Sequence, residues 1–260
     1  MRPKKKLGQH FLTAPSYARK IALAIPAKPD DHILEIGPGK GALSVHLKER
    51  FPRLNLVELD GDVIAELTVK LGEGEWVLHT CDVMKFDFLK VGVPLHVAGN
   101  LPYSIGALII KKTLLYAEAI ASCTFMVQRE VAERISAPAH TKRNGFLSIF
   151  CQFFGNPRIL FHIPAGAFFP KPKVESSVFQ LIVRTDLRER LAPAVWNDFF
   201  KFVDRGFKMR RKTLVNVLGR NGSKEAYSEA LRRLGIGVMA RPEDLSVEEW
   251  LALYRETGLL

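Results

Sequence analysis

Residues 35–41 have the sequence Glu35-Ile36-Gly37-Pro38-Gly39-Lys40-Gly41, at the end of the apolar run His32–Ile36. An apolar run of this length predicts a buried strand, and the residues after Gly41 have a helical pattern. Glycines at a strand-to-helix turn let the backbone approach a bound ligand, with the helix N-terminus facing it. The order G-x-G-x-G lacks the last glycine of the dinucleotide motif, so a nucleoside site and a dinucleotide site both remain open here.

Strands and helices alternate around this turn. We expect further strands at 54–59, 76–80, 95–98 and 123–127, and helices at 16–25, 41–50, 61–71 and 105–116. This alternation predicts a mostly parallel sheet covered on both faces. Two last strands, 158–163 and 177–183, are joined by a Pro-rich loop that is too short for a helical crossover, so they should form an antiparallel hairpin. The expected fold is therefore α/β with a seven-stranded sheet.

The strand pattern ends after residue 183. Helices are expected at 194–207, 209–219, 224–234 and 247–255, and Ser246 and Glu249 have the spacing of a capping box for the last of them. Ser16 is the expected cap of the first helix of the chain. A boundary near 184–192 predicts an α/β domain over residues 1–184 and a small all-helical domain over residues 185–260.

The composition is that of a folded and basic protein. The 260 residues have a formal net charge of +11, and 47% of them are hydrophobic, which excludes a disordered chain and a collagen-like repeat. No apolar run reaches the roughly 20 residues that a membrane span needs. The basic excess indicates a polyanionic partner, nucleic acid before an anionic membrane surface. Residues 29–110 carry more acidic than basic side chains, which suits a separate small-ligand site.

The cysteines and histidines indicate no metal chemistry. Cys81, Cys123 and Cys151 have no C-x-x-C spacing, and the seven histidines are scattered along the chain. This sparse, odd number of cysteines is typical of a reducing compartment. The N-terminus has neither the apolar segment nor the cleavage site of a targeting peptide. We therefore expect a cytoplasmic protein without a bound metal.

Two carboxylates end the strands that follow the glycine turn. Glu58 ends the second strand, 17 positions after Gly41, where a carboxylate can accept both hydroxyls of a ribose. Asp82 ends the third strand and could accept a hydrogen bond from an adenine amine. The alternatives are a solvated strand-end Glu58 and an ordinary turn Asp82. A tight turn without a ligand would explain the glycines alone, but Glu58 beside them favours a ligand site with a ribose.

The fourth strand ends in Gly99-Asn100-Leu101-Pro102-Tyr103, at the sheet edge where open α/β folds place their chemistry. The Asn100 side-chain oxygen and a following backbone carbonyl offer two acceptors. Pro102 fixes the turn, and Tyr103 offers a flat face to a base. This arrangement suits an exocyclic amine held by two N–H groups with its lone pair toward an electrophile. A proline turn with an Asx-type cap is the alternative.

These residues resemble the rRNA adenine N6,N6-dimethyltransferase family, whose N-L-P-Y motif matches residues 100–103. The resemblance covers essentially the whole chain and is strongest to bacterial small-subunit members. It implies a class I S-adenosylmethionine-dependent methyltransferase, with a Rossmann-like sheet and a helical C-terminal domain. Further segments match the family in the same order, at residues 7–12, 35–39, 58–60, 128–132, 168–176 and 207–214.

The resemblance also implies roles for individual residues. S-adenosylmethionine would contact His10 and Leu12 at its methionine end, Gly37 and Gly39 through the backbone, Glu58 at the ribose, Asp82 at the adenine amine and Asn100 at the methyl group. The target amine would be oriented by Asn100, Leu101 and Pro102, and the target base would stack between Tyr103 and Phe168.

Two basic segments are expected to bind RNA phosphates: Lys4, Lys5 and Lys6, and Arg210, Arg211 and Lys212. A flexible basic tail and an ordinary solvated helix face are the alternatives. The resemblance implies that a monomeric enzyme acts on two adjacent adenosines near the 3′ end of 16S rRNA, in a small ribosomal subunit or its precursor.

Three alternative functions are considered. A large-subunit rRNA adenine methylase of the antibiotic-resistance type typically has Ile at the position of Leu101 and lacks the Arg210–Lys212 context. A non-catalytic assembly factor or mitochondrial transcription factor would not need an intact Asn100–Tyr103 motif, although an assembly role could coexist with catalysis. A nicotinamide oxidoreductase is disfavoured by the glycine spacing.

Overall fold

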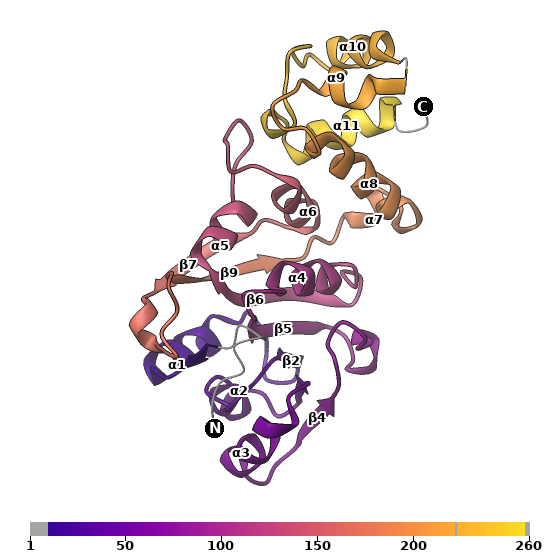
Figure 1. Cartoon of the computed structure of the whole chain (residues 1–260). Helices are drawn as coiled ribbons and strands as arrows, with labels where there is room; N and C mark the ends of the chain where they lie inside the picture. The colour runs from indigo at the N-terminus through magenta and orange to yellow at the C-terminus, as the bar shows by residue number, and fades with distance from the viewer. Residues whose placement is uncertain (1–9, 222, 258–260) are drawn as a thin grey trace. The chain divides into compact units, whose positions relative to one another are not determined.

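The computed structural model describes residues 10–221 and 223–257, and Figure 1 shows their elements. The strand before the glycine turn is β2 (His32–Ile36), whose last four residues are buried. In the main sheet, β3 (Leu54–Glu58) and β5 (Leu95–Asn100) flank β2 in parallel. Outside them, β4 (Trp76–Thr80) pairs with β3 and β6 (Ile120–Gln128) pairs with β5, again in parallel. The carboxyl ends of all five strands therefore meet at one edge.

The sheet is completed by the expected antiparallel strands. β9 (Ser176–Ile182) pairs antiparallel with β6, and β7 (Arg158–Ile163) pairs antiparallel with β9. The seven strands have the order β4-β3-β2-β5-β6-β9-β7. The predicted fold class, a mostly parallel seven-stranded sheet with an antiparallel hairpin, is confirmed.

Helices of the α/β unit cover the sheet. α1 (Pro15–Ala24), α2 (Ser44–Arg50) and α3 (Gly61–Leu71) share one apolar core with the strands, with Ile21, Leu47 and Leu67 at most 1% exposed. α4 (Gly106–Leu114) packs on β6. The prediction that Ser16 caps the first helix is wrong, because α1 begins at Pro15, whose fixed φ suits the first helical position.

A second, two-stranded sheet was not predicted. β1 (Phe11–Leu12) pairs antiparallel with β8 (Phe168–Phe169), within the loop expected between β7 and β9. Thr13 continues this contact, since its backbone N–H and its hydroxyl both donate to the carbonyl of Ala167. Strands of two residues are too short to show a periodic pattern. The pairing fixes the start of the described chain beside the segment 167–169.

The helical unit contains more of the chain than the sequence indicated. Residues 133–155 group with residues 184–257, whereas the sequence-based boundary assigned them to the α/β domain. α5 (Arg129–Ile135) leads into this unit and α6 (Phe146–Phe154) belongs to it. The physical reason is an aromatic core, because Phe153 and Phe154 of α6 contact the rings of Trp196 and Phe200.

The remaining helices are α7 (Leu187–Arg190), α8 (Trp196–Phe207), α9 (Leu214–Leu218), α10 (Lys224–Arg233) and α11 (Val247–Thr257). Four of them lie in the expected regions, and α7 lies in the segment expected as the domain boundary. The predicted capping box of α11 is confirmed: Ser246 N–H donates to the Glu249 carboxylate, and Glu249 N–H donates to Ser246 Oγ. None of the helices in the described ranges is long and apolar enough to cross a bilayer.

Candidate active site

The glycine turn forms one wall of the site. Gly37, Gly39 and Gly41 have φ angles of 65°, 52° and 73°, a region that glycine enters at little cost. The Glu58 carboxylate at the end of β3 accepts hydrogen bonds from the backbone N–H groups of Gly39 (3.0 Å), Leu59 (2.8 Å) and Asp60 (2.9 Å). The predicted carboxylate therefore holds the turn and the end of β3 together.

Gly99 lets β5 approach β2 at the same edge. A Cβ atom at this position would collide with the backbone oxygen of Ile36, at the start of the glycine turn. The close approach brings Asn100, the last residue of β5, to the turn, where a Cβ on Gly37 would lie 3.9 Å from its backbone oxygen. Gly99 thus places the Asn100–Tyr103 segment beside the glycines.

The Asn100 amide is oriented by the N-terminal segment. Its Nδ2 donates to the backbone oxygen of His10 at 2.9 Å, a contact between residues 90 positions apart. This contact uses the donor end of the amide, so Oδ1 is the end presented as an acceptor. The next residue, Leu101, is 1% exposed and its N–H donates to Met126 O at 3.0 Å, which fixes the turn against β6.

Tyr103 and His10 form the aromatic side of the site. Their ring centroids lie 5.1 Å apart, with planes inclined by 34°. The Tyr103 hydroxyl is 2.6 Å from Ser176 Oγ, and His10 Nδ1 is 2.7 Å from the carbonyl oxygen of Pro170. Burial raises the pKa of Tyr103, and the Ser176 contact offsets part of this rise. Tyr103 therefore stays neutral near pH 7 and offers a ring face rather than a charge.

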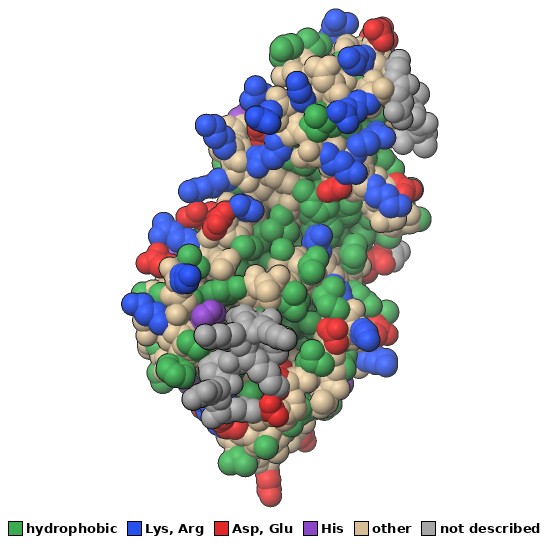
Figure 2. Space-filling view, in the orientation of Figure 1, with side chains coloured by type: hydrophobic (Ala, Val, Ile, Leu, Met, Phe, Trp, Pro, Cys, Tyr) green, Lys and Arg blue, Asp and Glu red, His purple; other side chains and the backbone are tan. Residues whose placement is uncertain are grey.

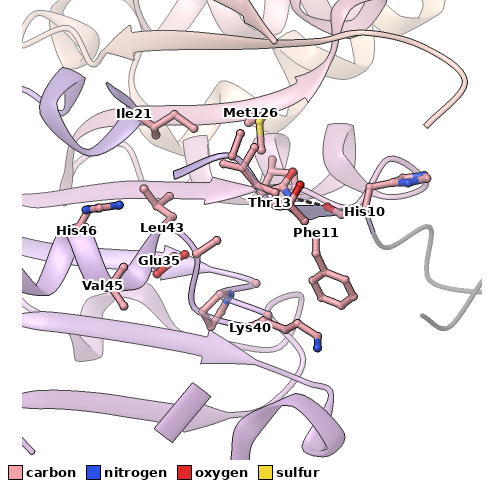
Figure 3. Close-up of a pocket in the computed structure, with 18 of the residues that line it drawn as sticks. His10, Phe11, Thr13, Ile21, Glu35, Lys40, Leu43, Val45, His46 and Met126 are labelled. Atoms are coloured by element: carbon pink, nitrogen blue, oxygen red, sulfur yellow. Dashed lines mark hydrogen bonds between the residues drawn. The ribbon is translucent and has the colours of Figure 1, made fainter. Parts of the chain in front are cut away.

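These residues enclose a cavity of about 520 Å³ at the carboxyl edge of the sheet (Figure 3). Its lining is partly apolar, with Ile21, Leu43, Val45 and Met126 labelled in the figure. Glu35 at the end of β2 also lines it and is 1% exposed. Burial raises the pKa of Glu35 to about 8, the Ser44 hydroxyl opposes this rise and the Glu58 charge adds to it.

The structure brings most of the predicted site residues together. The lining of the cavity includes the predicted residues His10, Leu12, Gly37, Gly39, Glu58, Asn100, Leu101, Pro102 and Tyr103. Asp82 is not part of this lining. It follows β4, and its Oδ1 accepts from Met84 N–H at 2.8 Å in a turn.

Phe168 does not offer a free ring face to a base. It is 4% exposed and belongs to the apolar core beneath the β1–β8 pair, so the structure does not bring it to the cavity. Its neighbour Phe169 is 64% exposed. The alternation of side chains along a strand separates the two rings, and two adjacent phenylalanines in sequence do not show which of them faces the core.

The predicted RNA ligands differ from one another in the structure. Lys4, Lys5 and Lys6 lie outside the described residues. The Arg210 guanidinium donates to the carbonyl oxygens of Lys142 (2.7 Å) and Asn144 (2.9 Å), whereas Arg211 and Lys212 are exposed. Figure 2 shows many Lys and Arg side chains on the visible face of the helical unit. Arg210 is therefore engaged within the protein, and its two neighbours remain accessible.

Comparison with known proteins now gives the family. Residues 1–258 match the ribosomal RNA adenine dimethylase family. The chain belongs to this family. It is 37% identical over 257 residues to the ribosomal RNA small subunit methyltransferase A of Acinetobacter baylyi, covering 96% of this chain and 90% of that protein. The protein of the same name from Aromatoleum aromaticum is 38% identical over 258 residues, with coverages of 97% and 93%.

Solved structures share the fold. A dimethyladenosine transferase from Plasmodium falciparum has a TM-score of 0.80 at 23% identity, covering 95% of this chain and 97% of that one. The 23S rRNA methyltransferase ErmE has a TM-score of 0.73 at 23% identity, with coverages of 95% and 98%. Because the second protein is named for the large-subunit RNA, the fold alone does not identify the target RNA.

The chain is therefore an rRNA adenine methyltransferase that uses S-adenosylmethionine. The residues of the cavity fit this cofactor. The glycine turn leaves backbone free of side chains, Glu58 lines the cavity, and the buried Glu35 Oε2 has no hydrogen-bond partner among the described residues. Glu35 was not predicted as a site residue, because the apolar pattern marks it only as part of the strand. Its place two residues before the first glycine of the turn was the signal that could have identified it.

Proposed function

We propose that the protein dimethylates N6 of two adjacent adenosines near the 3′ end of small-subunit rRNA during ribosome assembly. The observation that carries this proposal is the Asn100 amide, oriented by the His10 carbonyl at 2.9 Å and placed at the cavity wall. The names of the two relatives, both small subunit methyltransferases at 37% and 38% identity, support the small-subunit target.

The proposed chemistry depends on position rather than on a general base. The target adenine leaves its stack to reach the cavity. Asn100 Oδ1 and the Leu101 carbonyl accept its two N–H groups, while the Tyr103 ring supports the base. When bound, S-adenosylmethionine supplies the methyl group. The N6 lone pair would bond to the methyl carbon as the S–CH3 bond breaks, with its electron pair left on the sulfur of S-adenosylhomocysteine, and the methylated amine would then lose a proton to solvent. Positioning of this kind can contribute roughly 7–11 kcal/mol to lowering a barrier.

The two aromatic rings expected to stack on the base differ in burial. Phe168 could take this role only if its ring left the core in which it is buried. Tyr103 is half-buried beside His10 and needs no such movement. We therefore propose that the target base stacks mainly on the Tyr103 ring. For the cofactor, we propose that its adenine contacts Asp82, which is not part of the cavity lining.

A large-subunit target is the second candidate, since ErmE has the same fold. Leu101 in place of Ile and the exposed Arg211 and Lys212 favour the small subunit over this alternative. An assay with labelled S-adenosylmethionine and undermethylated small or large subunits, followed by mass spectrometry of the modified bases, separates the two. Label in two adjacent small-subunit adenosines is the expected result, and label only in large-subunit RNA would contradict the proposal.

We further propose that the enzyme acts as a monomer in the cytoplasm. Cys123 and Cys151 are free and buried, and Cys81 is free and partly exposed, which suits a reducing compartment. Sedimentation of the purified protein tests the first point: a concentration-independent mass near 29.2 kDa is expected.

A further inference from the structure

Glu35 is a buried carboxyl group for which the methyl-transfer geometry gives no role. It is 1% exposed, lines the cavity, and is the second-last residue of β2, the strand that leads into the glycine turn. Its Oε2 has no hydrogen-bond partner among the described residues. A carboxylate in such surroundings carries a large desolvation cost unless it is protonated or paired with a positive charge.

The two other carboxylates of the cavity lining already have partners. Glu58 on β3 accepts three backbone N–H groups, and Glu66 on α3 pairs with Lys40 of the turn at 2.8 Å. The remaining titratable groups of the lining are His10 and Tyr103 near Asn100, His46 on α2 and Lys70 on α3. His10 and Tyr103 also make the contacts described above, to Pro170 and Ser176.

The environment of Glu35 favours its neutral form when no cation is near. Burial is the largest cause, the Ser44 hydroxyl acts in the opposite direction and the Glu58 charge adds to the effect, with a resulting pKa of about 8. At pH 7 the group is therefore mainly protonated. A positive charge within a few ångströms favours the carboxylate and lowers its pKa. S-adenosylmethionine has a sulfonium and an ammonium group against one carboxylate, so it carries a net positive charge into the cavity.

We propose that Glu35 releases its proton when the cofactor enters, and that the resulting carboxylate balances the positive charge of bound S-adenosylmethionine. The proton passes from the carboxyl group to the buffer, and no covalent bond of the cofactor changes. The proposal rests on the family's use of this cofactor. A consequence is that the affinity for S-adenosylmethionine rises with pH, because the free energy needed to deprotonate Glu35 becomes smaller.

Proton release can be measured directly by titration calorimetry. S-adenosylmethionine is titrated into the full-length protein at pH 7.0 in phosphate and in Tris, whose ionisation enthalpies differ strongly. The heat difference should report most of one proton released per cofactor. The release should disappear at pH 9.5, where Glu35 is ionised before the cofactor binds.

Two variants and one neutral ligand identify the source of the proton. Glu35→Gln keeps the shape of the neutral side chain and should abolish the release. Glu66→Gln changes a half-exposed carboxyl on the same cavity and should leave it unchanged. The nucleoside 5′-methylthioadenosine has no sulfonium or ammonium group and should release no proton.

Three results would overturn the proposal: equal heats in both buffers for the wild type, an unchanged release from Glu35→Gln, or an equal release with 5′-methylthioadenosine. If Glu35→Gln does not fold, the wild type alone decides, because a release that persists at pH 9.5 excludes Glu35. A wild type that binds S-adenosylmethionine without releasing a proton refutes the role of Glu35 and leaves the methyltransferase function intact.

Discussion

The side-chain amide of Asn100 has a donor end and an acceptor end, and the fold gives them different surroundings. The donor end is bound to the His10 carbonyl at 2.9 Å, so the acceptor end remains for a substrate amine. A motif in the sequence can identify Asn100. It cannot show which backbone carbonyl, 90 residues earlier in the chain, fixes its orientation.

The two phenylalanines of β8 should differ in their contribution to stability. Phe168→Ala removes a 4%-exposed ring from the core and should lower the free energy of unfolding by about 3–5 kcal/mol. Phe169→Ala, which removes a 64%-exposed ring, should change it by about 0.5 kcal/mol or less. Urea unfolding of both variants checks this difference. Equal losses would mean that Phe168 is not packed as described.

His96 on β5 should make stability depend on pH. It is 5% exposed, with Nδ1 2.8 Å from Ser122 Oγ and Nε2 3.3 Å from Asp31 Oδ2. Burial lowers its pKa, and Asp31 only partly opposes this. The unfolded chain therefore takes up a proton more readily than the folded one. The stability that His96 contributes is present above pH 6.5 and is lost as the pH falls below it.

Urea unfolding of the wild type and of His96→Asn between pH 7.5 and 5.0 isolates this effect. The free energy of unfolding should fall more steeply with decreasing pH in the wild type than in the variant. The difference between the two curves removes the contribution of Glu35, which acts in the opposite direction because its pKa is raised. Parallel curves would exclude His96 as the cause.

At the scale of elements, the positions of the seven strands of the main sheet and of most helices could be predicted because each strand is a short apolar run next to a turn or a helix. The β1–β8 pair could not, since two-residue strands carry no period and their contact spans more than 150 positions. α6 was missed because its nine residues are strongly apolar, with Ser148 and Gln152 the polar exceptions, and a short apolar run does not distinguish a buried helix from a strand. The same aromatic residues then place 133–155 in the helical unit.

Arg210 should stabilise the loop between α5 and α6. Its guanidinium donates to the carbonyl oxygens of Lys142 and Asn144, and it lies 3.9 Å from the Glu243 carboxylate. Arg210→Ala should therefore loosen the loop and speed tryptic cleavage after Lys142 and Arg143 several-fold. Arg211→Ala is the matched control and should leave the cleavage rate unchanged. An unchanged cleavage rate in Arg210→Ala would contradict the stabilising role of Arg210.

At the scale of the whole molecule, the uneven distribution of charge along the sequence indicated two sites. One is a small-ligand site in the acidic part of the chain, and the other is an RNA-binding surface in the basic part. The acidic residues 29–110 include Glu35 and Glu58 at the cavity, and the helical unit carries Arg211 and Lys212 at its surface. The approximate regions of both sites could be predicted. The different roles of Arg210 and of its neighbours Arg211 and Lys212 could not be predicted. They depend on the carbonyl groups of Lys142 and Asn144, which lie in a loop far away in the sequence.

Loss of the exposed cations should weaken binding to small ribosomal subunits and reduce its salt dependence. For Arg211→Ala, the slope of log affinity against log salt should decrease in magnitude by roughly 0.7–0.9 if one phosphate contact is lost. Lys85→Ala, which removes an exposed cation from the α/β unit, is the control and should leave the slope unchanged. An unchanged slope in Arg211→Ala would place the RNA surface elsewhere.

The most direct test compares the wild type with Asn100→Ala on undermethylated small subunits, using labelled S-adenosylmethionine and mass spectrometry of the modified bases. The proposed function predicts N6,N6-dimethyladenosine at two adjacent positions with the wild type. It predicts at least a hundredfold slower transfer with Asn100→Ala, while subunit binding is retained. Transfer by Asn100→Ala at the wild-type rate, or no adenine methylation by the wild type, would contradict the account.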